Sequence, residues 1–168
     1  MENTKMQLLL VQALARLVGC ECWGIACGYG TGSRVLFSIG KKIKLDKPIQ
    51  NEHLSDDMRN YDSEFSLFVK NSAWRLERQS EIICTSNSDN KKNQEMQVGL
   101  SMVVGSRIMS AQLIGDFFDL IVAFDNGCVL RTFTSSVEEY GGEYSVSTLR
   151  YILSVEPRAR LDYFEKRA

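Results

Sequence analysis

The chain lacks an excess of charge of either sign. Its 20 Lys and Arg side chains nearly cancel its 21 Asp and Glu side chains. Domains that bind nucleic acid through phosphate neutralisation usually carry a basic excess, so direct nucleic-acid binding is not the expected function. The 168 residues also include only two prolines and no low-complexity run, which argues against long disordered linkers. We therefore expect a single domain over residues 1–168.

Long hydrophobic runs are also absent. Near the start of the chain, the apolar residues 8–11 and 13–15 are interrupted by Gln12. A signal peptide needs a longer apolar core after a basic start, and a membrane span needs about 20 apolar residues. The five cysteines are odd in number and unevenly spaced, unlike a disulfide framework. We therefore expect a cytoplasmic protein with reduced thiols and no membrane contact.

Histidine is scarce, because His53 is the only one in the chain. It lies near Glu52 and Asp56, so it could act as a general base oriented by one carboxylate, with Ser55 as the nearest nucleophile in sequence. No nucleophile-elbow motif accompanies this group. A solvated surface histidine is the simpler interpretation, and we do not expect an enzyme.

A zinc site would need three cysteines near the start of the chain, with either His53 or Cys84 as the fourth ligand. On a continuous strand the three thiols diverge, because Cys20 and Cys22 face one way and Cys27 faces the other. Their spacing also differs from the knuckle that is usual in structural zinc sites. We therefore expect no metal and no other cofactor.

The strongest local signal in the sequence is Asn126-Gly127, which predicts a β-hairpin with a type I′ turn. Such a turn pairs Phe124 with Val129, Ala123 with Leu130, Val122 with Arg131, Ile121 with Thr132 and Leu120 with Phe133. Both faces of this hairpin are then largely apolar. That pattern predicts a position in the middle of a covered sheet.

A second hairpin is predicted over residues 63–77, with its turn at Asn71-Ser72. The predicted register pairs Val69 with Trp74, Leu67 with Leu76 and Phe65 with Arg78. On its outer face, Arg75 would either pack on the Phe68 ring or pair with Glu77. Residues 82–84 either extend the second strand or begin a third.

Other strands follow from alternating hydrophobicity. Residues 21–45 predict two or three antiparallel strands, with a glycine-rich turn at 28–33 and a second turn at Gly40-Lys41. Residues 107–114 predict a further strand, and 144–148 a final one. The tail at 157–168 is either a helical turn or frayed.

Two helices complete the expected fold. Apolar residues at helical spacing predict a helix over about 4–19, through Leu8, Val11, Leu14 or Ala15, and Val18. Met96, Leu100 and Val103 predict a short helix within 95–104 that ends at Gly105. The expected fold class is α+β: a mostly antiparallel, curled β-sheet, like a half-barrel or a sandwich, with both helices packed on it. Its β-rich body would span about 21–150.

Acidic side chains gather on two polar segments, 46–64 and 137–143. The first is the longest polar loop and carries six of them. Loops longer than about 12 residues in compact domains are often functional. The paired acids at 56–57 and 138–139 do not match a calcium loop, so the clusters are either solvated or complementary to a basic partner. The candidate partner-binding residues are Asp46, Glu52, Asp56, Asp57, Asp62, Glu64, Glu138, Glu139 and Glu143.

The order of these motifs resembles a broad group of small β-rich bacterial proteins. The resemblance rests on GTGS before a strand, on SEFSLFV leading to Trp74-Arg75-Leu76, on VVGSRI, on DLIVAFDNGCVLRTF and on the short strand near Tyr144. It covers roughly residues 23–148. Some of that group look like immunity proteins, which are encoded beside polymorphic or contact-dependent growth-inhibition toxins.

The resemblance implies that the protein binds a cognate toxin stoichiometrically and brings no catalytic residue with it. A basic, nuclease-type toxin would suit the acidic loops, because nucleases carry positive surfaces for phosphates. The alternative function is a small-ligand-binding domain whose pocket walls are Trp23, Tyr29, Phe37 and Trp74. A concave aromatic cavity would favour this alternative, and a filled interior would exclude it.

Overall fold

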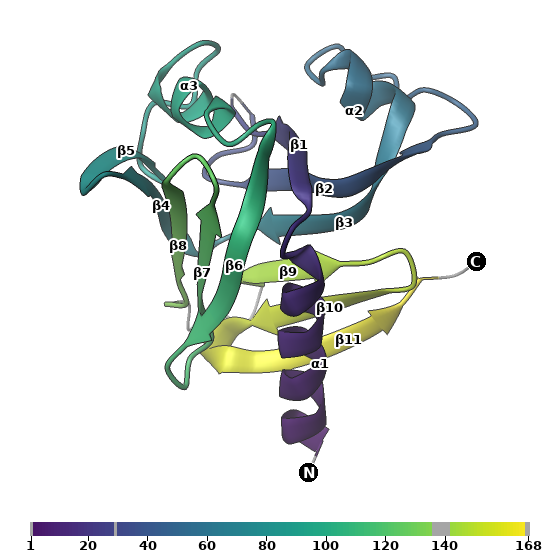
Figure 1. Ribbon diagram of the computed structural model, residues 1–168, viewed down its shortest axis with the longest axis vertical. Helices are drawn as coiled ribbons and strands as arrows, with labels where there is room; N and C mark the ends of the chain where they lie inside the picture. Colours follow the sequence, from purple (N-terminus) through teal and green to yellow (C-terminus); the bar gives the residue numbers. More distant parts are fainter. Residues whose placement is uncertain (1, 29, 136–141, 167–168) are drawn as a thin grey trace.

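The structure is a computed structural model that describes residues 2–28, 30–135 and 142–166. Its described part contains a single 11-stranded sheet with the order β11-β10-β9-β3-β2-β1-β6-β7-β8-β4-β5 (Figure 1). Every neighbouring pair of strands is antiparallel, which confirms the α+β class. The strands are β1 (Glu21–Ala26), β2 (Val35–Lys44), β3 (Tyr61–Val69), β4 (Ala73–Arg78), β5 (Glu81–Thr85), β6 (Ser106–Ile114), β7 (Asp119–Phe124), β8 (Cys128–Phe133), β9 (Tyr144–Ser147), β10 (Tyr151–Glu156) and β11 (Arg160–Glu165). The helices are α1 (Glu2–Leu17), α2 (Asp56–Asn60) and α3 (Glu95–Ser101).

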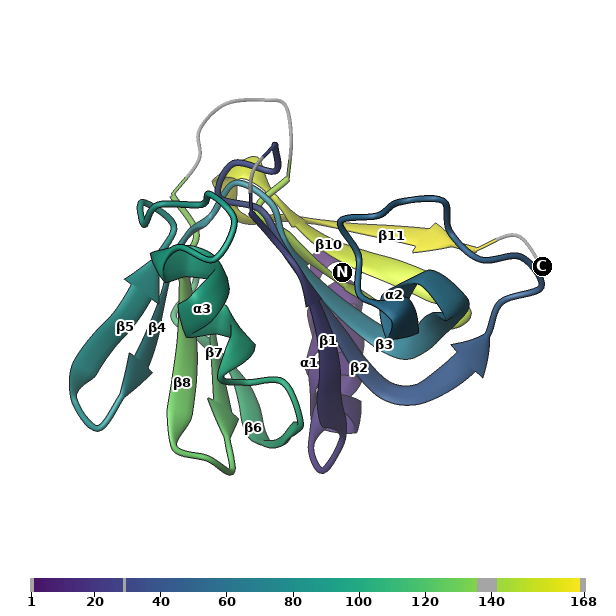
Figure 2. The same ribbon diagram turned by 90° about the horizontal axis from the view of Figure 1, so that it is seen from above.

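The sheet curls around one hydrophobic core. Seen from above, β4 to β8 form one wing, and β1 to β3 with β9 to β11 form the other (Figure 2). Buried side chains from both wings belong to the same cluster, including Phe37 of β2, Leu67 of β3, Trp74 of β4 and Leu130 of β8. In the described part of the chain no helix has the length and hydropathy that crossing a bilayer requires.

Helix α1 confirms the predicted N-terminal helix, but it buries a different face. Its core stripe is Leu10, Ala13, Leu14 and Leu17, which shares Leu14 with the expected stripe, whereas Leu8, Val11 and Val18 are 57%, 46% and 46% exposed. Both stripes have helical spacing, and the one that carries three leucines buries the larger apolar area. The helix contacts β6 on one side and β9, β10 and β11 on the other, so it fills the space between the wings.

The β7–β8 hairpin forms as predicted, but its register is shifted by one residue. Val122 lies opposite Leu130, and Leu120 lies opposite Thr132. The loop has three residues, 125–127, in which Gly127 alone takes a positive φ, of 83°. This geometry is a type I turn closed by a left-handed glycine, and not a type I′ turn. As a result one face is core and the other is half-buried, so the hairpin is not covered on both sides.

Asn126 explains why this turn is preferred. Its Oδ1 accepts a hydrogen bond from the Cys128 backbone N–H at 3.0 Å, and its Nδ2 donates to the Met102 carbonyl oxygen at 2.7 Å. The second bond ties the turn to the chain that follows α3.

We expect Asn126→Ala to lower the free energy of unfolding by about 1–3 kcal/mol, because both partners of Asn126 lose a hydrogen bond. Urea denaturation checks this, with the exposed Asn87→Ala as the matched control; equal stability of the two variants would contradict the role of Asn126.

The predicted hairpin at Asn71-Ser72 is wrong. Strand β3 pairs with β2 and β9, and β4 pairs with β5 and β8, so the two strands lie in opposite wings. Between them the backbone N–H groups of Lys70 and Asn71 donate to the Glu143 carbonyl oxygen, at 2.9 and 3.3 Å. These bonds replace the turn that would have folded β4 back on β3. Residues 82–84 belong to the separate strand β5.

Two further segments differ from expectation. Gly40, with φ of 82°, forms a bulge inside the ten-residue strand β2 and not a turn. The sheet also continues past residue 150, because β10 and β11 add to the predicted final strand β9. In the tail as far as residue 166, only the 3₁₀ turn Pro157–Ala159 is helical, and β11 follows it along β10 with Leu161 buried.

Helix α3 is shorter than predicted, and Gly99 in its middle has a packing role. A Cβ atom at this position would lie 2.6 Å from the Cys84 Sγ of β5. The glycine therefore lets the helix backbone approach the strand. The helix ends at Ser101 and not at Gly105 as predicted; Gly105, with φ of 85°, follows the turn after the helix.

The Tyr144 hydroxyl ties the two wings together inside the core. It donates to the Phe118 carbonyl oxygen at 2.7 Å, and Phe118 precedes β7. Tyr144→Phe keeps the ring but removes the shorter of the two hydrogen bonds to this carbonyl and leaves the Thr134 hydroxyl at 3.5 Å, so we expect a loss of about 1 kcal/mol of unfolding free energy. The exposed Tyr163→Phe is the control. Denaturation midpoints that coincide for the two variants would contradict this account.

Candidate functional site

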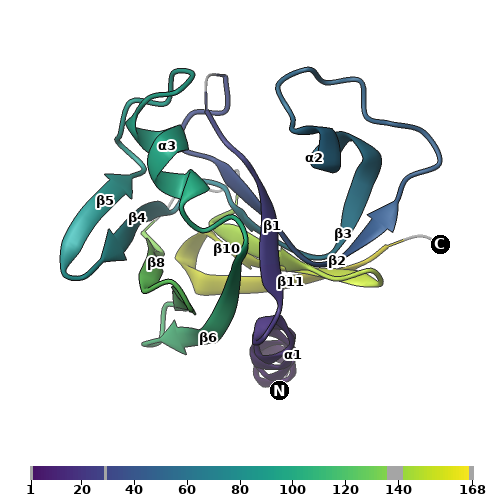
Figure 3. The same cartoon turned by 45° about the horizontal axis from the view of Figure 1, so that its top comes forward.

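Residues 45–62 connect the end of β2 to the start of β3, and the connection projects from the sheet and carries α2 (Figure 3). We call this segment the β2–β3 ledge. Its helix α2 begins after Ser55, whose hydroxyl accepts the Met58 backbone N–H at 3.3 Å. Backbone bonds from Leu45 to Asn60 and from Ile49 to Arg59, at 2.9 and 2.8 Å, close the loop on itself. These bonds fold the segment back on itself, although much of it is exposed.

Met58 anchors the ledge to the outer face of the sheet, away from the core. Its side chain is buried but does not belong to the core cluster. It lies over Gly24 of β1, where a Cβ atom would come within 3.0 Å of the Met58 Cγ. Because Gly24 has no side chain, it leaves a notch in the sheet surface in which the Met58 side chain packs.

The ledge brings five of the predicted acidic residues together in exposed positions: Asp46, Glu52, Asp56, Asp57 and Asp62. Asp57 forms an ion pair with Lys42 at 2.7 Å, and Asp56 forms one with Arg59 at 3.7 Å. No ion pair within 4.0 Å joins the other three to another described residue.

Basic residues are interleaved with these acids, although the sequence prediction considered the acids alone. Residues 41–64 contain five basic and six acidic side chains. The ledge therefore presents an alternation of charges and not a strongly negative field.

The remaining predicted acids do not share this surface. Glu64 is half-buried in β3, and its carboxylate accepts the Lys41 backbone N–H at 3.2 Å. Glu143 is 0% exposed, and its Oε2 accepts the Ser72 hydroxyl at 2.9 Å. Because Glu143 is buried, its side chain cannot contact a partner. It instead bonds to Ser72, in the segment that connects β3 to β4. Glu138 and Glu139 lie outside the described residues.

His53 is exposed on the ledge and shares a hollow of about 310 Å³ with Glu52 and Cys27. Cys27 and His53 are 26 residues apart in the chain, so their proximity depends on the tertiary fold and was not predicted. Burial raises the pKa of the Cys27 thiol to about 11, and no hydrogen bond joins it to His53 in the described structure. The group therefore lacks the thiolate that nucleophilic catalysis needs at neutral pH.

All five cysteines are free. Burial raises the pKa of Cys22 and of Cys84 to about 12 each, so neither is a reactive thiolate. Among the described residues, no group of three or more His, Cys, Asp or Glu side chains is arranged to hold a metal ion.

Of the four aromatic residues proposed as pocket walls, the three that the structure describes do not share one site. Phe37 and Trp74 are buried in the core, where the Trp74 indole donates to the Ser33 carbonyl oxygen at 2.7 Å. Trp23 lies outside the core cluster, beneath the Lys42 ammonium at 5.3 Å, and its indole nitrogen has no hydrogen-bond partner in the described structure. Tyr29 lies outside the described residues. Phe37 and Trp74 therefore serve core packing, whereas Trp23 lies outside that cluster.

A cavity of about 370 Å³ lies instead beneath the β2–β3 ledge. Its walls come from β2, β3 and the ledge itself: Leu36, Ser38, Leu45, Lys47, Ile49, Leu54, Met58, Tyr61, Asp62, Ser63 and Ser66. The serines and Leu36 supply the sheet side, and aliphatic side chains supply the ledge side. No signal in the sequence predicted this cavity, because its two sides meet only after β2 and β3 have paired.

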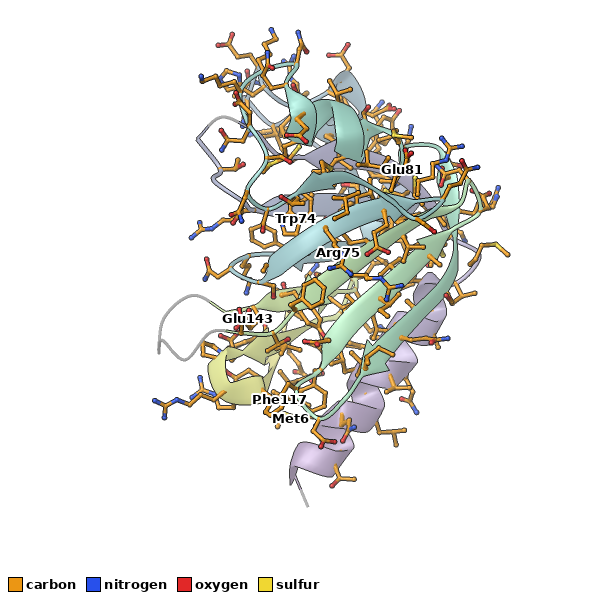
Figure 4. All side chains as sticks on the ribbon, turned by 90° about the vertical axis from the view of Figure 1, so that its left-hand side faces the viewer. Met6, Trp74, Arg75, Glu81, Phe117 and Glu143 are labelled. Carbon is orange, nitrogen blue, oxygen red and sulfur yellow. The ribbon has the colours of Figure 1, made fainter. Side chains whose placement is uncertain are left out.

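A charged cluster covers the outer face of the other wing. The Glu77 carboxylate pairs with the guanidinium groups of Arg75 and, at 3.0 Å, of Arg131. Arg75 also lies over the Phe133 ring, 5.0 Å from its centre, on the solvent side of β4 (Figure 4). The predicted pairing with Glu77 is confirmed, but Phe133 takes the place of Phe68 because β8 is the neighbour of β4.

No protein-family model, curated protein or solved structure matches this chain.

The Glu77 cluster makes stability depend on pH. Burial alone would raise the pKa of this carboxyl, but the hydrogen bonds and charges of Arg75 and Arg131 outweigh it, so the pKa is lowered. A lowered pKa contributes stability above the unfolded value, and the contribution is lost as the pH falls through the folded value. We expect Glu77→Gln to be less stable than the parent at pH 7, with the difference shrinking below pH about 4. Urea unfolding from pH 7 to pH 3 measures it, and a difference that persists unchanged at pH 3, or one equal to that of the exposed Glu81→Gln, would refute it.

Proposed function

We propose that the protein neutralises a cognate bacterial toxin by binding it stoichiometrically in the cytoplasm. In this proposal the β2–β3 ledge covers the active site or the substrate surface of the toxin. The protein acts as an inhibitor and not as an enzyme, and it needs no cofactor. The partner is basic, as a nuclease that binds phosphate backbones would be.

The observation that carries the proposal is the anchored, exposed set of carboxylates on the ledge. Asp46, Glu52 and Asp62 have no ion pair among the described residues, so cationic groups of a partner can approach them without first displacing an internal one. The ledge is already ordered by α2 and by its backbone bonds, which lowers the entropy cost of binding.

The alternation of charge on the ledge supports selectivity. Lys42 and Arg59 neutralise Asp57 and Asp56, so the unpaired carboxylates are separated by cationic positions. A partner must match this pattern, because like charges brought together cost several kcal/mol at an interface. An immunity protein needs such discrimination between its own toxin and related ones.

Co-expression with the product of the neighbouring gene tests this proposal. We expect a complex of one copy of each chain that forms at micromolar concentration. Asp46→Asn with Asp62→Asn should lower the association rate at low salt by about tenfold and weaken its dependence on salt. Asparagine keeps the carbonyl that accepts the Ser63 backbone N–H at position 62, so the fold is preserved.

The matched control removes two carboxylates elsewhere, through Glu81→Gln with Asp116→Asn, which are both exposed. Stopped-flow mixing of the two proteins gives the rates. Failure to form the complex, or equal rates for the two double variants, would contradict the proposal.

A further inference from the structure

We propose that the cavity beneath the β2–β3 ledge binds a small, uncharged molecule with an aliphatic body and a hydroxyl or carbonyl end. Toxin neutralisation needs no such ligand, so this inference goes beyond the proposed function, although the cavity shares the ledge and Asp62 with the proposed toxin-binding surface. The inference rests on the shape of the cavity, on hydroxyl groups without partners and on the placement of charge.

The cavity is built in two layers. Its floor is the outer face of the sheet, where Ser38 of β2 and Ser66 of β3 lie directly opposite each other. Its roof is the ledge, through Leu45, Ile49 and Leu54. The volume of about 370 Å³ lies within the range of small-molecule sites, which is about 300–1,000 Å³.

The floor carries hydroxyl groups that the protein leaves unpaired. Ser38 and Ser63 are only 5% and 8% exposed, and Ser66 is half-buried. None of the three hydroxyls makes a hydrogen bond with another described residue, although all three residues line the cavity. Their oxygens remain accessible, because none of them is among the fully enclosed polar atoms that lack a partner in the described structure, so a polar group of a ligand could reach them.

The charges around the cavity favour a neutral ligand. The charged residues among its walls are Lys47 and Asp62, which are exposed and opposite in sign. A charged head group at the serine floor would be buried without an ionic partner, which is costly. Three hydroxyls that both donate and accept are suited to a hydroxyl or a carbonyl oxygen.

The roof can adapt to the ligand. Met58 lines the cavity and also packs in the notch at Gly24. Methionine is unbranched and has several low-energy rotamers, so it fits irregular partners. Its methyl group is therefore a reporter of occupancy that sits inside the site.

The test is a titration of the whole protein, labelled with ¹³C at its methionine methyl groups, with 1-hexanol, hexanoate and hexylammonium. We expect 1-hexanol to shift the Met58 methyl resonance saturably, and both charged probes to bind at least about tenfold more weakly. Absence of a saturable shift up to the solubility limit of 1-hexanol would overturn the proposal. Equal binding of all three probes would overturn it too.

Variants locate the binding. Ser66→Leu fills the cavity and should abolish the shift, and Ser38→Ala with Ser63→Ala should weaken the binding several-fold without filling the space. Ser147→Ala is the matched control, because Ser147 lies opposite Ser66 on the other side of β3 but does not line the cavity. Circular dichroism checks that each variant folds; if Ser66→Leu does not, the alanine pair decides. Binding that the folded variants leave unchanged would place the probe elsewhere and refute the site.

Discussion

The crossing between β3 and β4 is the constraint on which the rest of the structure depends. Strands joined by three residues usually form a hairpin, but here they belong to opposite wings of the sheet. The Glu143 carbonyl oxygen accepts two backbone N–H groups of the crossing, and the Glu143 carboxylate accepts the Ser72 hydroxyl. The Glu143 N–H in turn donates to the Val155 carbonyl oxygen, at 2.7 Å. Glu143 thus connects the segment between β3 and β4 to the ends of β9 and β10 by hydrogen bonds.

The position of the ledge follows from this arrangement. Because β3 continues toward the crossing and not into a hairpin, it is free to pair with β2 along its length and with β9 on its other side. The long β2–β3 pair supports the ledge at one end, and its outer face becomes the floor of the cavity. The same pairing leaves the inner faces of both strands to the core, through Phe37 and Leu67. Core and candidate sites therefore use opposite faces of the same two strands.

Local patterns in the sequence predicted the elements better than their partners. Alternating hydrophobicity placed β7 and β8, and helical spacing placed α1, because these signals depend on residues close together in the chain. The register of β7 with β8 was missed because the Asn126 side chain favours a three-residue turn through Met102, which is distant in sequence. The buried face of α1 was missed because two apolar stripes compete and only tertiary packing selects one. Strand β11 was missed because it depends on pairing with β10.

In the candidate sites, too, local features could be predicted from the sequence, whereas features that depend on tertiary contacts could not. Exposure of Asp46 and Asp62 was predictable from a polar loop, whereas burial of Glu143 depends on Ser72, 71 residues earlier. The cavity depends on the register that sets Ser38 against Ser66, which no local pattern indicates.

The central claim is that recognition resides in the β2–β3 ledge. Hydrogen exchange of the protein, with and without the product of the neighbouring gene, tests it most directly. If the partner binds the β2–β3 ledge, amide exchange on binding becomes slower within residues 45–62 and stays unchanged along α1. Protection centred on the exposed α1 stripe of Leu8 and Val11, with the ledge unchanged, would contradict it.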